Sequence, residues 1–318
     1  MGICILEARE ALNMYDIIII GGGPAGMTAA LYAQRNGKKA LVIERNGFGG
    51  QITHSPKVEN YPGTLQMSGN EFADKMLDQI MAQGAEIELE NAVAVEDRGK
   101  TKVVRTEEGS AFEGRAVVIA TGVKHRMLGL PGEDELVGEG ISFCAVCDGD
   151  FYSGQRVCVA GGGNSALQEA VLLSEKCGEV VILQDLHALT GEQKLQDALR
   201  AKANVRAICD TKINGLVTDN GALRGVEIES RTTGEKQVVH CDGLFVAIGL
   251  IPENEPFEAL AELNDWGYFA SGEDCKTRTP GVYVAGDCRS KGVRQLTTAV
   301  ADGATAALAA CRYIDTEL

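Results

Sequence analysis

The residues best suited to chemistry are two cysteines three positions apart, in the segment Cys144-Ala-Val-Cys147. The sequence has 10 cysteines, and the other eight stand alone along the chain. A CxxC spacing lets two sulfurs meet in a disulfide, and the surroundings of such a pair can favour one thiolate. We interpret the pair as a redox-active dithiol, with two structural core cysteines as the alternative.

Half of a zinc site is a further alternative for this pair. Structural zinc takes four ligands, usually from two such pairs, and the sequence has neither a second CxxC nor clustered histidines. We therefore expect no metal. Asp148 directly follows Cys147 and can shuttle a proton when a disulfide opens. The segment Asp148-Gly-Asp150 is also typical of a turn, which is the structural alternative for this aspartate.

A glycine-rich segment, Gly21-x-Gly23-x-x-Gly26, directly follows an apolar run over 15–20 and opens a helix expected over 27–35. In that context the glycines permit a tight turn, close approach of a pyrophosphate and close helix packing. The helix N-terminus adds unpaired N–H groups and the positive end of a dipole. The sequence therefore predicts a dinucleotide site, and its candidate residues are Gly21, Gly23, Pro24, Ala25, Gly26 and, at the end of the next strand, Glu44, which would bind an adenosine ribose.

A second segment, Gly161-x-Gly163-x-x-Ala166, lies between strands expected over 156–160 and 179–183. Gly161, Gly163, Asn164, Ser165 and Asp185 are its candidate nucleotide-binding residues. Gln184 takes the position of Glu44, Asp185 comes next, and residues 184–190 contain no arginine. A carboxylate suits the free 2′-hydroxyl of NADH, whereas NADPH requires a cation near its 2′-phosphate. We expect a nucleotide site that binds NADPH poorly.

These two segments open two copies of one module. Each copy has a strand, a glycine-rich loop, a helix and a second strand, followed by a β-meander over 86–118 in the first copy and 205–246 in the second. An internal repeat of this size indicates duplicated domains, and the length of 318 residues also suggests about two domains. The fold class expected is α/β, with two Rossmann-like dinucleotide-binding domains.

Composition excludes several classes of function. Thirty Lys and Arg against 45 Asp and Glu give a formal net charge of −15, which argues against binding nucleic acid or anionic membranes. No apolar run approaches the 18 or more residues of a membrane span. Residues 1–13 lack the pattern of a signal peptide. Isolated cysteines suit a reducing compartment, so we expect a cytoplasmic protein.

The order and spacing of the motifs resemble those of the low-molecular-weight thioredoxin reductases, from about Tyr15 to Tyr313. The matching segments are Gly21–Gly26, Gly50-Gln-Ile-Thr53, Val58-Glu-Asn-Tyr-Pro-Gly63, Ala120-Thr-Gly122, Cys144-Ala-Val-Cys-Asp148, Gly161–Ala166, Thr279-Pro-Gly-Val-Tyr-Val-Ala-Gly-Asp287 and Arg294-Gln295.

The resemblance implies an FAD-binding domain made of residues 1–122 and 252–318. It also implies that residues 123–251 form an inserted NAD(P)-binding-like domain, which carries the CxxC pair. Each domain would have the three-layer ββα arrangement of this family, and the inserted domain would rotate as a unit on hinges near 122–123 and 249–252. The family resemblance further implies a homodimer.

Residue roles follow from the same resemblance. Cys147 would be the thiol beside the flavin, Cys144 the interchange thiol that attacks the partner's disulfide, and Asp148 the acid–base residue. Asp287 would hold the ribityl and pyrophosphate end of FAD. The other cofactor-binding residues implied are Gly50, Gln51, Thr53, Asn60, Ala120, Thr121, Gly122, Gly286, Arg294 and Gln295.

Two departures from the family pattern bear on the electron donor and the partner. The family's NADPH segment carries His-Arg-Arg and a further Arg four residues on, where this chain has Gln184-Asp185-Leu186 and Thr190. Glu139 also replaces the basic residue that many relatives have ahead of the cysteines. NADPH is therefore disfavoured as donor, and thioredoxin docking is expected to differ in detail.

The expected function is an FAD-dependent disulfide oxidoreductase, a thioredoxin-disulfide reductase that receives electrons from NADPH or NADH and passes them through FAD and Cys144/Cys147. The partner would be thioredoxin or a thioredoxin-like protein. The alternatives are a ferredoxin-dependent flavin thioredoxin reductase that does not use NADPH, and a flavin/disulfide redox sensor without turnover. Trp266 and the alanine-rich helix expected over 302–313 are interpreted as core packing.

Overall fold

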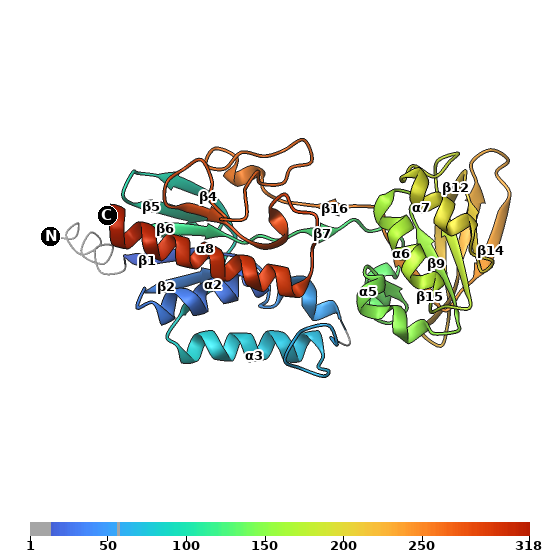
Figure 1. Cartoon of the computed structure of the whole chain (residues 1–318), viewed down its shortest axis with the longest axis horizontal. Coiled ribbons are helices and arrows are strands. Elements are labelled where there is room, and N and C mark those ends of the chain that lie inside the picture. The colour runs from blue at the N-terminus through green and yellow to red at the C-terminus, as the bar shows by residue number, and fades with distance from the viewer. Residues whose placement is uncertain (1–13, 56–57) are drawn as a thin grey trace. The chain divides into compact units, whose positions relative to one another are not determined.

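The computed structural model describes residues 14–55 and 58–318, and the chain forms two compact units within it (Figure 1). The first unit holds residues 14–53, Tyr61–Lys124 and Ile251–Leu318, and the second holds His125–Leu250 together with residues 54–55 and 58–60. The first thirteen residues, including Cys4, lie outside the described part. Because the chain leaves the first unit and later returns to it, the second unit is an insertion in the first.

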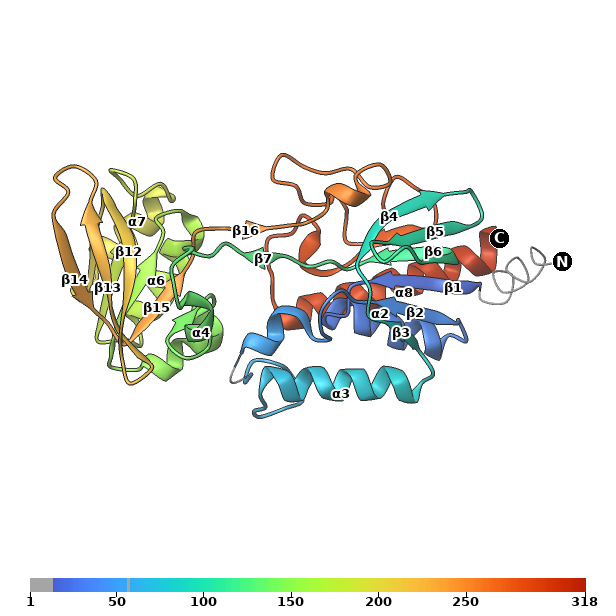
Figure 2. The same cartoon turned by 180° about the vertical axis from the view of Figure 1, so that it is seen from behind.

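The first unit is built on a seven-stranded sheet in the order β3-β2-β1-β6-β5-β4, with β17 paired to β6 (Figure 2). Strand β1 is parallel to β2 and β6, and β4, β5 and β6 form an antiparallel meander. The strands are β1 (Tyr15–Ile20), β2 (Ala40–Ile43), β3 (Glu86–Glu88), β4 (Ala92–Asp97), β5 (Lys102–Thr106), β6 (Ala111–Ile119) and β17 (Val282–Val284).

Both faces of this sheet are covered because its central strand is apolar on both sides. Ile17 and Ile19 of β1 pack into one buried cluster with alanines of the helices α2 and α8, while Ile18 and Ile20 pack into another with the loop residue Phe269. Alternate residues of a strand point to opposite faces, so a continuous run of isoleucines serves both clusters. The helices are α2 (Pro24–Arg35), α3 (Gly69–Ala82) and α8 (Leu296–Glu317), with the 3-10 turns η1 (Gly50–His54), η3 (Glu255–Phe257) and η4 (Gly286–Cys288).

The second unit repeats this plan with a parallel sheet in the order β11-β10-β9-β15-β8 and a separate antiparallel sheet of β12, β13 and β14. Val157 and Val159 of β9 pack with helix α6, whereas Cys158 and Ala160 face the antiparallel sheet. Its elements are α4 (Glu133–Leu136), β8 (Ile141–Ser142), α5 (Ala145–Asp148), η2 (Gly149–Tyr152), β9 (Arg156–Ala160), α6 (Asn164–Ser174), β10 (Glu179–Leu183), α7 (Gln193–Arg200), β11 (Val205–Ile208), β12 (Thr211–Asp219), β13 (Ala222–Ser230), β14 (Lys236–His240) and β15 (Gly243–Val246).

Two short strands carry the chain between the units. β7 (Lys124–His125) and β16 (Leu250–Ile251) pair in a two-stranded sheet of their own. The predicted α/β class, with two dinucleotide-binding domains of which the second is inserted, is confirmed. Within the described residues, no helix combines the length and apolar character needed to span a membrane.

The prediction that Trp266 packs in the core is wrong, because this side chain is 75% exposed. It lies in a tight turn in which Asn264 Oδ1 accepts the N–H groups of Trp266 and Tyr268, each at 3.0 Å. That turn presents the indole to solvent. The interpretation of the C-terminal helix as core packing holds, since Ala306, Ala307 and other residues of α8 are buried against α2.

Candidate functional site

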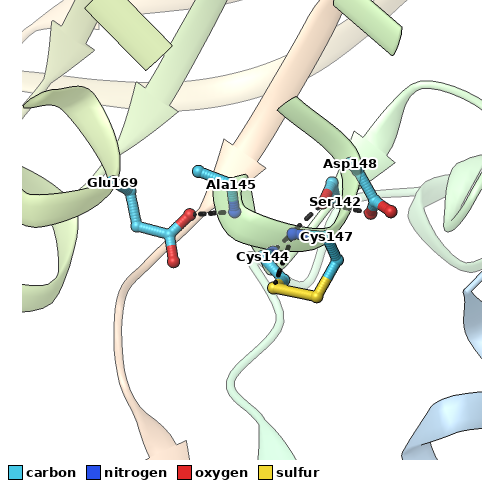
Figure 3. Close-up of a disulfide and its surroundings, with 6 residues drawn as sticks. All are labelled: Ser142, Cys144, Ala145, Cys147, Asp148 and Glu169. Carbon is cyan, nitrogen blue, oxygen red and sulfur yellow. Dashed lines mark hydrogen bonds between the residues drawn. A yellow bond between two sulfur atoms is a disulfide. The ribbon is translucent and has the colours of Figure 1, made fainter. Parts of the chain in front are cut away.

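The two cysteines of the CxxC segment are joined in a disulfide, with their Cα atoms 5.3 Å apart (Figure 3). Cys144 is the N-cap residue of the short helix α5, and Cys147 lies in its first turn. The backbone N–H of Cys147 points back to Cys144 Sγ at 3.2 Å. A thiolate formed at Cys144 would therefore keep an N–H donor already aimed at it, and a hydrogen bond to sulfur stabilises its negative charge.

The strand before the helix supplies the next residue of the site. β8 pairs in parallel with β15 and brings Ser142 to the start of α5. Ser142 Oγ accepts the backbone N–H of Cys144 at 3.1 Å and donates to Asp148 Oδ2 at 2.6 Å. Sequence reasoning missed Ser142, because a serine two residues before a cysteine carries no signal of its own.

Asp148 has the environment of a group that can hold a proton. It is only 8% exposed, and its Oδ1 is buried with no hydrogen-bond partner among the described residues. Burial raises the pKa of the Asp148 carboxyl, and the hydrogen bond from Ser142 opposes that shift. An unclaimed carboxylate oxygen beside a redox disulfide is available to accept or deliver a proton.

A second carboxyl, Glu169 of α6, lies on the other side of α5 (Figure 3). Its Oε2 accepts the backbone N–H of Ala145 at 2.5 Å. Burial raises the pKa of Glu169 to about 7; the bond from Ala145 opposes this shift, and the charge of Asp148 adds to it. Sequence reasoning missed Glu169 as well, because its contact with α5 spans 24 positions and no motif marks it.

The first glycine loop has the geometry of a phosphate cradle. Gly21 has a φ of +109°, and any side chain there would collide with the carbonyl oxygen of Ala120. α2 begins at Pro24 after Gly23, and no side chain caps its first turn. The nearest atom to a side chain added at Gly23 would be 3.9 Å away, at the Gly49 oxygen. The loop is therefore open on the side where helix N–H groups can meet an anion.

The carboxylate predicted to bind a ribose lies beside this loop. Glu44 directly follows β2, and its Oε2 accepts the N–H of Gly22 at 2.6 Å while its Oε1 accepts the N–H of Asn46 at 2.9 Å. These bonds fix the carboxylate at the carboxyl end of the strand. Each oxygen keeps a lone pair for a further donor.

Asp287 is the most informative residue of the first unit. It lies in η4 beside Gly286, where an added side chain would stand 2.8 Å from Ala25 in the first turn of α2. Asp287 Oδ1 is buried without a hydrogen-bond partner among the described residues. Burial raises the pKa of Asp287, and the nearby cations Lys291 and Arg294 oppose that shift. An orphaned acceptor next to a phosphate cradle fits the hydroxyl groups of a bound FAD.

The other predicted flavin-site residues lie in four segments. Gly50, Gln51 and Thr53 lie in η1, where Thr53 Oγ1 donates to the Gly50 carbonyl at 2.8 Å. Ala120, Thr121 and Gly122 follow β6, Arg294 stacks on the ring of Tyr268 and donates to the Asp287 carbonyl, and Gln295 caps α8. Asn60 belongs to the short stretch that groups with the second unit.

The second glycine loop keeps the scaffold of the first. Gly161 has a φ of +117°, and a side chain there would stand 2.6 Å from the Ala247 oxygen. α6 begins at Asn164 after Gly163, again with no side-chain cap. The carbonyl of Gly162 accepts the N–H of Thr190 at 2.8 Å, as the carbonyl of Gly22 accepts that of Gly49 in the first loop.

The residues around this second loop differ from those around the first. Buried Gln184 packs on Gly162 in the place that Glu44 takes beside Gly22. Asp185 is exposed and pairs with Arg231 at 3.3 Å. Arg231 follows β13, so an arginine that contacts the 184–190 segment comes from a hairpin far along the chain, which sequence reasoning did not consider.

The chain is similar to known proteins over most of its length. The chain matches the family described as pyridine nucleotide-disulphide oxidoreductase over residues 15–303. It is 39% identical over 303 residues to a thioredoxin reductase of Listeria monocytogenes, with 95% of each chain covered. It is 40% identical over 300 residues to the 34.2 kDa protein in the rubredoxin operon of Clostridium pasteurianum, covering 94% of this chain and 97% of that one. The solved thioredoxin reductase of Streptococcus pyogenes superimposes with a TM-score of 0.90 at 37% identity, over 95% of this chain and 99% of that one.

The raised pKa of Glu169 makes a prediction about folding stability. The folded chain holds this proton more tightly than the unfolded chain, because the pKa rises from 4.5 to about 7. The resulting stabilisation is complete below pH 4.5 and is lost as the pH rises through 7, a change of about 3 kcal/mol. Urea unfolding from pH 4.5 to 8 should show this extra loss in the wild-type chain and not in Glu169→Gln. Parallel pH profiles for the two proteins would contradict the assignment.

Proposed function

The chain belongs to the pyridine nucleotide-disulphide oxidoreductase family and, within it, to the thioredoxin reductases, and we propose that it is an FAD-dependent thioredoxin-disulfide reductase. The observation that carries this proposal is the Cys144–Cys147 disulfide with the buried carboxyl of Asp148 beside it. One oxygen of that carboxyl, Oδ1, has no hydrogen-bond partner among the described residues. The partner proposed is thioredoxin or a thioredoxin-like protein, because curated relatives are thioredoxin reductases. A reducing cytoplasm suits the seven free cysteines of the described residues, and a homodimer is proposed from the family resemblance alone.

We assign the FAD site to the first unit. The loop Gly21–Gly26 and the start of α2 would hold the pyrophosphate, Glu44 the adenosine ribose, and Asp287 a hydroxyl of the ribityl chain. FAD, when bound, supplies the two-electron chemistry that links a nicotinamide hydride to a disulfide. The protein itself would bind and orient this group, and the buried Oδ1 of Asp287 would accept a hydrogen bond from it.

The residues around α5 then perform the thiol chemistry. Two electrons and one proton convert the Cys144–Cys147 disulfide into one thiol and one thiolate, and the Asp148 carboxyl is placed to deliver that proton. Ser142 donates to Asp148 Oδ2 at 2.6 Å and so stabilises the carboxylate left behind. The thiolate attacks the partner's disulfide, a mixed disulfide forms, and attack by the second thiol restores the Cys144–Cys147 bond and releases a reduced partner.

We place the reducing nucleotide at the second glycine loop and propose NADH in preference to NADPH. This loop shares three features with the first loop. It turns at a glycine with positive φ, it leads into a helix whose first turn no side chain caps, and its middle glycine carbonyl accepts a backbone N–H. Residues 184–190 carry no arginine for a 2′-phosphate, and the charge of Arg231 is shared with Asp185. Reduced ferredoxin is the second candidate donor, favoured by the neutral Gln184 in the place of the ribose-binding carboxylate.

The thiol chemistry predicts the behaviour of four single variants. Cys144→Ser and Cys147→Ser should each abolish steady-state reduction of thioredoxin, because neither can re-form the disulfide. Asp148→Asn should lower that rate by about a hundredfold or more. The control is Cys209→Ser, which replaces a free cysteine elsewhere in the second unit and should leave the rate unchanged.

No thioredoxin reduction by the wild-type protein would instead favour a redox sensor without turnover. The serine variant that forms a stable mixed disulfide with thioredoxin identifies the attacking thiol.

The orphaned oxygen of Asp287 predicts a loss of flavin. Asp287→Ala removes the buried acceptor, so the purified variant should carry less FAD than wild type, measured as flavin absorbance at matched protein concentration. Asp274→Ala, an exposed aspartate of the same unit, is the matched control and should keep full flavin content. Equal flavin content in Asp287→Ala and wild type would contradict the role given to Asp287.

The electron donor is tested by anaerobic bleaching of the oxidised, yellow protein. We expect NADPH to bleach the flavin slowly or not at all, and NADH to bleach it faster. Residues 184–190 carry no arginine for a 2′-phosphate, and Asp185 offers a carboxylate to a free 2′-hydroxyl. Rapid bleaching by NADPH would overturn this prediction. Bleaching by reduced ferredoxin alone would replace the nucleotide proposal with the second candidate.

A further inference from the structure

We propose that Glu169 is a positioning residue for the redox disulfide: it holds the first turn of α5 in place, and its charge sets the balance between disulfide and dithiol. This proposal rests on the proposed function, because it assumes that Cys144 and Cys147 open and close during turnover. Nothing in the motif that identifies the cysteines includes Glu169, which comes from the middle of α6.

The contact is one of several bonds that hold the start of α5. Ala145 is only 1% exposed, so its N–H has no access to bulk water, and Glu169 Oε2 accepts it at 2.5 Å. The N–H of Cys147 is directed at Cys144 Sγ and that of Cys144 at Ser142 Oγ. The carboxylate therefore binds the peptide group whose carbonyl belongs to Cys144, one peptide bond from the sulfur-bearing residue.

The charge of Glu169 gives this contact a second effect, on the reduced state of the cysteine pair. Ionised Glu169 would lie close to any thiolate formed on the pair, and two negative charges at one buried site oppose each other. Opening the disulfide therefore raises the affinity of Glu169 for a proton, and an ionised Glu169 in turn disfavours the reduced state. Burial already places the pKa of Glu169 at about 7, so its charge changes within the physiological range.

The charged neighbours leave Asp148 as the main electrostatic partner of Glu169. Asp148 lies on the opposite side of α5, and its charge adds to the raised pKa of Glu169. Most other charges on or next to the elements packed against α6 are paired: Lys176 with Asp150, Arg156 with Glu179, and Arg200 with Asp197. Lys194 of α7 is exposed to solvent, which screens its charge.

Two substitutions separate the bond from the charge. Glu169→Gln keeps an oxygen that can accept the Ala145 N–H and removes the charge. Glu169→Ala removes both. Above pH 7, Glu169→Gln should move the disulfide–dithiol equilibrium about tenfold toward the dithiol, which is about 30 mV for this two-electron couple. Below pH 6 the wild-type carboxyl is protonated, so the two proteins should agree.

The experiment equilibrates the flavin-containing full-length protein with dithiothreitol redox buffers between pH 5.5 and 8.5 and counts reduced Cys144 and Cys147 by alkylation. Glu175→Gln, an exposed carboxyl at the end of the same helix, is the control and should match wild type at every pH. Equal equilibria for wild type and Glu169→Gln at pH 8 would overturn the proposal. A difference that is the same at all pH values would also overturn it, because a purely structural change does not titrate.

The readout stays separate from the proposed activity. The redox equilibrium of the pair is measured without thioredoxin or nucleotide, so the role of Glu169 can fail while thioredoxin reduction is observed. Conversely, absence of thioredoxin reduction would leave the pH-dependent shift in place. If Glu169→Ala does not fold, the comparison of Glu169→Gln with Glu175→Gln still tests whether the charge of Glu169 shifts the redox equilibrium.

Discussion

The thiol chemistry depends on how the backbone N–H groups at the start of α5 are satisfied. Three N–H groups find partners there. That of Cys144 goes to Ser142 and that of Ala145 to Glu169, while that of Cys147 is shared between the sulfur and the carbonyl oxygen of Cys144. Buried N–H groups are costly to leave without a partner. These partners therefore hold the backbone on which both cysteines lie.

The surrounding fold delivers these partners from separate parts of the chain. β8 brings Ser142 through its parallel pairing with β15, and α6 brings Glu169 because the second glycine loop sets where that helix begins. In the first unit the same design places Glu44 and the start of α2 at the carboxyl ends of parallel strands, where α/β proteins bind nucleotides. One repeated scaffold thus supports the proposed cofactor site in one unit and the cysteine pair in the other.

Local spacing made the fold class and the two glycine loops predictable, because each loop's turn, helix start and strand lie within a few residues of one another. Ser142 and Glu169 were not predictable in this way. Their roles arise from contacts between elements that sequence spacing does not relate. Trp266 shows the opposite failure: an aromatic residue is usually buried, but the turn built by Asn264 leaves it exposed.

The most direct test of the account follows electrons through the disulfide in a single turnover. The protein, with its flavin reduced anaerobically by one equivalent of dithionite, is mixed with oxidised thioredoxin and quenched at successive times with an alkylating agent. We predict that Cys144 and Cys147 become alkylated first and that thioredoxin thiols then appear as this labelling declines. Reduction of thioredoxin while the Cys144–Cys147 disulfide stays intact throughout would contradict the central claim.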